Sequence, residues 1–115
     1  GIAGGGYTCG ALAGGVMAMS CFAGRSYDHF SDLECIRANM FPMARELCDR
    51  FEAEYGAQGG TCTAVQTKLL GKSFDLYRGD REGFAQSGGH LTACPSACGK
   101  AAVWTIEILH EHGRI

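Results

Sequence analysis

The stretch that decides the fold is SDLECIRANMFPMARELCDRFEAEYG, residues 31–56. Its apolar residues recur at steps of three and four, which is the period of one face of an α-helix. The residues that keep this period are Leu33, Ile36, Met40, Met43, Leu47, Phe51 and Tyr55. Ser31 and Glu34 have the spacing of a capping box, in which each side chain bonds a free backbone amide at the start of a helix. The pattern predicts one long amphipathic helix that begins at Ser31, ends at Gly56 and has a charged outer face.

Start and stop signals predict three more helices around this one. Residues 9–23 follow Thr8, a good N-cap, and are followed by Gly24. Residues 62–70 likewise lie between an N-cap threonine and a glycine stop. Residues 95–112 begin with a proline, which suits the first position of a helix. The β-branched residues in 103–109 are compatible with a strand, but the length and caps of the segment favour a buried helix.

Residues 72–91 mix charges, glycines and scattered aromatics, so they predict a long connection with one short helix from Asp80. The fold class that follows is all-α: a small bundle of about four to five helices with a long connection before the last one. A chain of 115 residues is long enough to bury a core without disulfide support, and residues 1–115 are expected to form a single domain.

Charge and hydropathy exclude two classes of partner. The chain has 10 basic and 12 acidic residues, a net charge of -2 and no basic run, so no nucleic-acid partner is expected. The longest apolar stretch, residues 9–23, is shorter than the roughly 20 residues that cross a bilayer, so no membrane span is predicted.

Cysteine is the unusual component of the composition. The chain has 7 cysteines, and an odd number argues against a fully paired secreted framework. A metal site or a reducing compartment such as the cytoplasm fits better, whereas removal of an upstream signal would place the protein in the periplasm.

The cysteines fall into two groups on the predicted helices. Cys21, Cys35 and Cys48 lie inside helices, where a free cysteine usually behaves as a small buried hydrophobe. The other four lie at or within the first turn of three helices; they are Cys9, Cys62, Cys94 and Cys98. The first turn of a helix carries unpaired amide donors and partial positive charge, which lower the pKa of a thiol. Thiolates at these positions are candidate metal ligands.

If the three helix starts converge, these thiolates share one site. Their mutual repulsion would be relieved by a bound cationic centre, by a disulfide or by protonation. Iron-sulfur clusters and zinc are both cationic centres of this kind. Cys94 and Cys98 form a C-x3-C pair, which does not name the metal, and His90 is an auxiliary candidate, although a lone loop histidine is more often solvated. Covalent c-type haem is not expected, because it needs C-x-x-C-H and Gly99 follows Cys98.

The N-terminal cysteine segment resembles that of a known family. Gly4-Gly5-Gly6 followed by Cys9-Gly10-Ala11-Leu12-Ala13-Gly14 is similar to the CGAxxG signature of the C_GCAxxG_C_C family of redox-active proteins, small bacterial and archaeal proteins that include the split-Soret cytochromes. Cys62 and Cys98 match later cysteines of that family. The resemblance implies redox work and an iron-sulfur centre, without the haem-binding segments of the cytochrome branch.

The family carries a further cysteine in a helix upstream of this signature, and the present sequence begins after that point. A fourth ligand is therefore expected from Cys94, from another group, or from a segment on another chain. Without that helix the apolar helix at residues 9–23 is uncovered, which predicts a homodimer or a partner subunit.

The first hypothesis is a protein in which Cys9, Cys62, Cys98 and Cys94 hold an iron-sulfur cluster for electron transfer. The alternatives are a thiol-disulfide redox protein without metal, and a structural module with zinc or free thiols. Oxidoreductase and electron-transfer protein both remain open, and the sequence names neither a substrate nor a redox partner.

Overall fold

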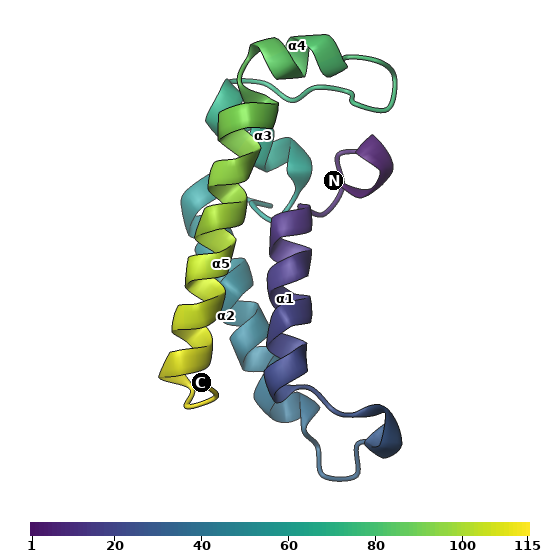
Figure 1. The fold of residues 1–115 in the computed structure, drawn as a ribbon, viewed down its shortest axis with the longest axis vertical. Coiled ribbons are helices and arrows are strands. Elements are labelled where there is room, and N and C mark those ends of the chain that lie inside the picture. The colour runs from purple at the N-terminus through teal and green to yellow at the C-terminus, as the bar shows by residue number, and fades with distance from the viewer.

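The computed structural model describes residues 1–115 and contains helices but no β-strand, which confirms the all-α prediction. Three long helices pack lengthwise: α1 (Gly10–Ala23), α2 (Arg37–Tyr55) and α5 (Cys94–Glu111). Figure 1 shows that α1 and α5 run in the same direction and α2 in the opposite one. The two short helices α3 (Cys62–Leu70) and α4 (Arg81–Gln86) lie at the end of the bundle where α5 begins.

The core lies between the three long helices. Phe51, Met19 and Ile108 contribute from α2, α1 and α5, and all three side chains are completely buried. Trp104 stands edge-on against Phe51, with ring centroids 5.5 Å apart, a geometry that aromatic pairs prefer. The buried stripe of α2 is the predicted one from the third residue of that stripe onward: Met40, Met43, Leu47, Phe51 and Tyr55.

The predicted start of the long helix is wrong, because α2 begins at Arg37 and not at Ser31. The capping group is the Asp32 carboxylate, which accepts hydrogen bonds from the amides of Ile36 (2.7 Å) and Arg37 (3.3 Å). A charged carboxylate with two oxygens is a stronger acceptor than the hydroxyl of the predicted capping box. Leu33 consequently lies outside the helix and is 92% exposed.

The predicted cap of the first helix is also wrong, because Cys9 and not Thr8 occupies the N-cap position of α1. Thr8 instead pairs with Thr61 in an isolated antiparallel β-bridge, which fixes its backbone as extended chain. Gly24 ends the helix as predicted, but in an extended conformation and without the left-handed turn typical of a glycine stop.

The two short helices follow the local sequence signals. The Thr61 hydroxyl caps α3 by accepting a hydrogen bond from the Ala64 amide at 3.1 Å. Gly71 ends α3 with φ 81°, a left-handed conformation that glycine adopts without strain. The short helix α4 follows Asp80, as predicted. The remaining helical turns are 3-10 turns at Ile2–Gly4 and Tyr27–His29.

The last helix starts earlier than predicted, because a π-helical turn at Gly89–Ala93 leads directly into α5. Pro95 explains this turn: a proline inside a helix clashes with the carbonyl four residues before it, and a wider turn relieves the clash. Pro95 lies in the first turn of α5, as predicted, one residue after the helix begins at Cys94. The segment 103–109 is helical, which excludes the strand alternative.

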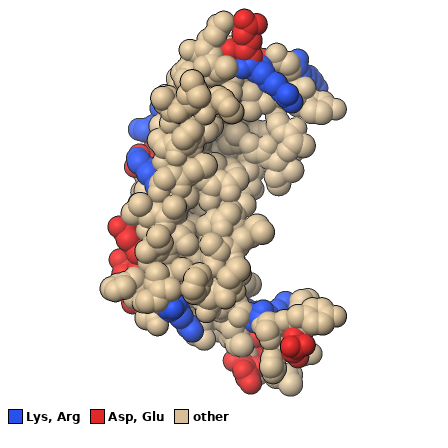
Figure 2. Space-filling model, in the orientation of Figure 1, with Lys and Arg blue, Asp and Glu red and all other residues tan.

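The molecule is elongated, with principal extents of 48 × 25 × 23 Å. The α4 end and the 24–36 loop both project to the side of α1, so that the outline is concave there (Figures 1 and 2). Charged residues cluster at the two projecting ends and along the opposite edge, and the concave side between them shows none in this view. None of the helices has the length and hydropathy needed to cross a membrane.

Candidate functional site

Two of the four predicted site cysteines are joined by the Thr8–Thr61 bridge. The Cys9 amide donates a hydrogen bond to the Gly60 carbonyl at 2.7 Å, and the Cys62 amide donates one to the Tyr7 carbonyl at 2.6 Å. Each cysteine is the residue directly after a bridging threonine. The bridge therefore sets the starts of α1 and α3 side by side, and with them their cysteines.

The other two cysteines come from α5. Cys94 and Cys98 are one helical turn apart on this helix, a spacing that puts both side chains on one face. The Cys94 amide is bonded to the Gly89 carbonyl, because the π-helical turn precedes it. Cys94 therefore does not have the free amides of a helix start, contrary to the sequence-based expectation.

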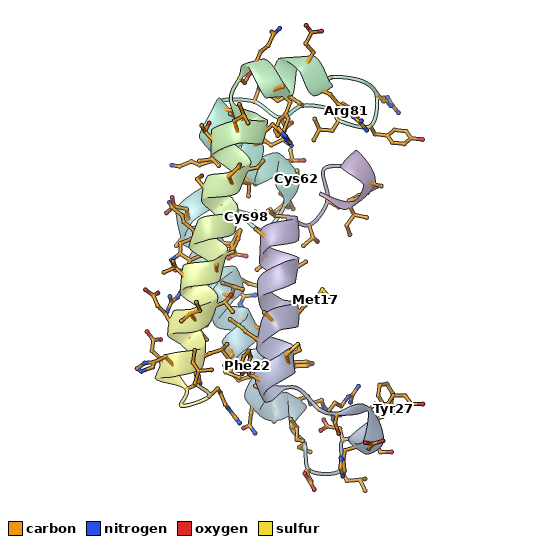
Figure 3. All side chains as sticks on the ribbon, viewed as in Figure 1. Met17, Phe22, Tyr27, Cys62, Arg81 and Cys98 are labelled. Atoms are coloured by element: carbon orange, nitrogen blue, oxygen red, sulfur yellow. The ribbon has the colours of Figure 1, made fainter.

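All four thiols are free, and they gather at one end of the bundle. Burial, and then repulsion from the thiols of Cys62, Cys9 and Cys98, raises the pKa of the Cys94 thiol. The expected lowering of the pKa is thus wrong for Cys94. Cys62 is buried, Cys9 and Cys94 are half-buried, and Cys98 is exposed. Figure 3 shows Cys62 and Cys98 near the point where α1 begins beside α5.

Tyr55, the last residue of α2, contributes an unexpected polar group to this end. Its side chain is buried, and its hydroxyl has no hydrogen-bond partner. Burial raises the pKa of the Tyr55 phenol first, and the charges of Glu54, Cys9, Cys98 and Cys94 raise it further. The phenol therefore lies within electrostatic reach of three of the four thiols. The sequence shows Tyr55 only as one residue of a core stripe.

Gln66 is a second polar residue that the sequence analysis missed. It is 3% exposed, and its side-chain amide nitrogen donates a hydrogen bond to the Cys62 sulfur at 3.1 Å. Its amide oxygen accepts a hydrogen bond from the Phe74 backbone at 2.8 Å, so the side chain is held at both ends. The only sequence signal was the i, i+4 spacing of Cys62 and Gln66 on a short helix.

His90, the predicted auxiliary residue, lies on the surface of the π-helical turn. Its exposed ring lines a hollow, together with Leu76, Arg81 and Phe84. No three His, Cys, Asp or Glu side chains of the chain lie together closely enough to bind a single metal ion.

Two of the three cysteines expected to fill the core are exposed. Cys21 is exposed on α1, and Cys35 lies in the turn before α2 with φ 53°. The prediction failed for Cys35 because Asp32 starts the helix later than expected. Only Cys48 packs against the core.

Comparison with known proteins gives one match. The sequence model of the family described as "Putative redox-active protein (C_GCAxxG_C_C)" covers residues 1–108. The chain belongs to the C_GCAxxG_C_C family. The name of this family supports a redox role, in agreement with the resemblance seen in the sequence. No curated protein and no solved structure matches the chain.

Within the C_GCAxxG_C_C family, this chain departs from the motif that gives the family its name. The name gives the signature as GCAxxG and not as the CGAxxG expected from the sequence, so it places the glycine before the cysteine, whereas this chain reads Cys9-Gly10-Ala11. This reversed order of glycine and cysteine puts the Cys9 thiol at the N-cap of α1, where the backbone is extended, and Gly10 at the first helical position. The cysteine therefore lies next to the bridge that also fixes Cys62.

Proposed function

We propose that this member of the C_GCAxxG_C_C family is an electron-transfer protein in which Cys9, Cys62, Cys94 and Cys98 hold an iron-sulfur cluster. One observation carries the proposal: the buried Tyr55 hydroxyl has no partner and lies within electrostatic reach of thiols from two helices. A buried hydroxyl without a hydrogen bond costs about 1–3 kcal/mol. A sulfur-rich anionic group beside it would accept that bond.

The chemistry of the donor set supports iron and sulfide. Thiolates are the ligands that hold iron-sulfur clusters, and the repulsion that raises the pKa of Cys94 is relieved when thiolates bind cationic iron. When bound, the cluster supplies a redox couple whose potential depends on hydrogen bonds to its sulfurs and on solvent exposure.

The residues of the chain have separate roles in this proposal. Gln66 holds the Cys62 sulfur in place through its amide, and its bond to Phe74 keeps that amide oriented. The Tyr55 hydroxyl donates a hydrogen bond to a sulfur and so stabilises negative charge at the site. Cys98 is the exposed member of the set in the single chain.

A single zinc ion and a cluster differ in how far apart their ligands lie. Zinc-sulfur bonds of about 2.3 Å at a tetrahedral ion place two thiolates about 3.8 Å apart. No group of three His, Cys, Asp or Glu side chains in the metal-free chain is placed to hold one metal ion. A cluster of several atoms joins ligands that are farther apart than those of a single ion. Thiol-disulfide exchange ranks second, because a raised pKa makes Cys94 a poor attacking thiolate at neutral pH.

The test is reconstitution of the full chain with ferrous iron and sulfide without oxygen, followed by iron and acid-labile sulfide analysis and electron paramagnetic resonance. We expect iron and sulfide to be bound together with a reducible signal. The variants Cys62→Ser and Cys94→Ser should lose most of the iron, whereas Cys21→Ser, at an exposed cysteine away from the site, should retain it.

Three results would overturn the proposal. A colourless chain with a reversible two-electron thiol couple would establish thiol exchange. Binding of one zinc ion without a redox response would establish a structural site. Equal iron loss in Cys21→Ser and Cys62→Ser would mean that the iron is bound nonspecifically.

A further inference from the structure

The helix α1 is apolar on every side but is covered on only one. It has no charged residue, and its buried residues are Leu12, Gly15, Met19 and Ala23. A helix without a polar face is normally surrounded by protein. Met17 and Phe22 on the other side are instead 70% and 58% exposed.

The uncovered side of α1 continues onto α5 and forms one surface, which we call the open face. A groove of about 340 Å³ runs along it between the two helices. The exposed residues that line this groove are Gly10, Gly14 and Ala18 of α1 and Cys98, Ala102 and Ile106 of α5. These small and apolar residues leave room for close approach by another helix.

We propose that a second copy of this chain docks on the open face and forms a two-fold dimer that covers Cys98. The surface area supports this occupant. The chain exposes 7193 Å², whereas a compact monomer of 12.2 kDa exposes about 6,100 Å². The surplus of about 1,100 Å² is comparable with the roughly 800 Å² that each partner contributes to a standard interface. The radius of gyration, 15.7 Å, also exceeds the roughly 13 Å of a compact chain of this length.

The open face is suited to pairing with itself. A two-fold interface uses the same patch on both chains, so the patch must contain both its hollows and its protrusions. The groove provides the hollow, and the exposed side chains of Met17 and Phe22 provide the protrusions. Figure 2 shows no charged residue along the middle of α1 and the part of α5 beside it, so two copies would not oppose like charges there.

The projecting ends fit the same arrangement. Both extend to the side of α1, as the positions of Arg81 and Tyr27 in Figure 3 show. Tyr77 near one end and Tyr27 at the other are 76% and 92% exposed. A two-fold axis across α1 brings the α4 end of one chain to the 24–36 loop of the other, so that exposed aromatic side chains meet at both ends.

The dimer would change the environment of the thiol site. Cys98 lines the groove, so the second copy would remove the most exposed of the four thiols from solvent. This dimer does not depend on the nature of the bound group, because the open face exists in the chain itself.

The experiment is sedimentation velocity of the full chain, reduced and without added metal, over a concentration series. We expect a reversible dimer, and a dissociation constant raised on the order of a hundredfold by Ala18→Arg or Ala102→Arg, because each buries an unpaired charge in the interface. The matched control is Ala53→Arg on the exposed side of α2, which should leave the constant unchanged. Circular dichroism checks that the variants keep their helices.

A second variant separates docking from folding. A Cβ atom added at Gly14 would meet no atom within 4 Å, so Gly14→Leu starts in open space, extends its side chain into the groove and raises helix propensity. We expect this variant to be at least as stable as the parent chain but to dimerise more weakly. A parent chain that is monomeric at every concentration, or a dimer that Ala18→Arg and Gly14→Leu leave intact, would overturn the proposal.

Discussion

The two ends of the three-helix bundle treat buried polar groups in opposite ways. At the end with the 24–36 loop, the Asp32 carboxylate is buried, but it accepts two backbone hydrogen bonds and faces the guanidinium groups of Arg25 and Arg37 at 3.9 and 3.6 Å. At the cysteine end, the Tyr55 hydroxyl has no partner, and repulsion between thiols contributes to the raised pKa of Cys94. The chain completes the interactions of the first end by itself. A bound group would improve those of the second.

The largest change in the free energy of unfolding should come from substitution of Asp32. We expect Asp32→Ala to lower the free energy of unfolding by about 3 kcal/mol, because it removes two hydrogen bonds to a charged acceptor. Urea unfolding measures this change. Asp28→Ala, at an exposed position in the same loop, should change the free energy of unfolding by less than about 0.5 kcal/mol. Equal effects would remove the contrast between the two ends.

The next effect concerns Gln66, the polar residue at the cysteine end that does have partners. Gln66→Leu leaves the Phe74 amide without its acceptor and should cost about 2 kcal/mol in the free energy of unfolding. The exposed residue Gln86 provides the control Gln86→Leu, which should be close to neutral. A neutral Gln66→Leu in urea unfolding would mean that the bridge from Phe74 to Cys62 does not stabilise the fold.

Substitution of Tyr55 should stabilise the chain, whereas substitution of Asp32 or Gln66 should destabilise it. In the metal-free chain, Tyr55→Phe removes a buried hydroxyl that has no partner, so we expect the free energy of unfolding to rise by about 1 kcal/mol. The exposed Tyr77 serves for comparison, and Tyr77→Phe should have no effect. A clear loss of stability in Tyr55→Phe would show that the hydroxyl already has a partner in the metal-free chain.

The smallest effect is a dependence on pH, because Cys94 is only half-buried. Its pKa is raised above the ordinary 9.0 in the folded chain, so the folded chain holds this proton more tightly than the unfolded chain. The contribution of this proton to the stability of the folded chain is complete below pH 9.0 and is lost as pH rises through the higher pKa of the folded state. Thermal melts of the metal-free chain should therefore show a melting temperature that falls at alkaline pH, and this fall should be smaller in Cys94→Ser than in Cys21→Ser. If the melting temperature fell equally with pH in both variants, the raised pKa of Cys94 would not be the cause.

The sequence predicts those parts of the fold that local signals control. Thr61 and Gly71 delimit α3 because a hydroxyl cap and a left-handed glycine act within one turn. The start of α2 was not predicted in this way, because the buried Asp32 carboxylate and not Ser31 supplies the capping group, with Arg25 and Arg37 beside it. The π-helical turn before Pro95 likewise depends on a helix that continues from Gly89.

The candidate site was predictable only in its thiols. Positions near helix starts singled out Cys9, Cys62, Cys94 and Cys98, although the electrostatic reason failed for Cys94. Tyr55 and Gln66 look like ordinary helical residues in the sequence. Their roles arise because the ends of α2 and α3 meet beside α1 and α5, which is a property of the packing.

The most direct test of the central claim is a crystal structure of the chain after anaerobic reconstitution, with iron located by its anomalous scattering. We predict iron bonded to the sulfurs of Cys9, Cys62, Cys94 and Cys98, with the Tyr55 hydroxyl hydrogen-bonded to a sulfur. Iron bound elsewhere, or a disulfide between Cys94 and Cys98 without iron, would contradict the account.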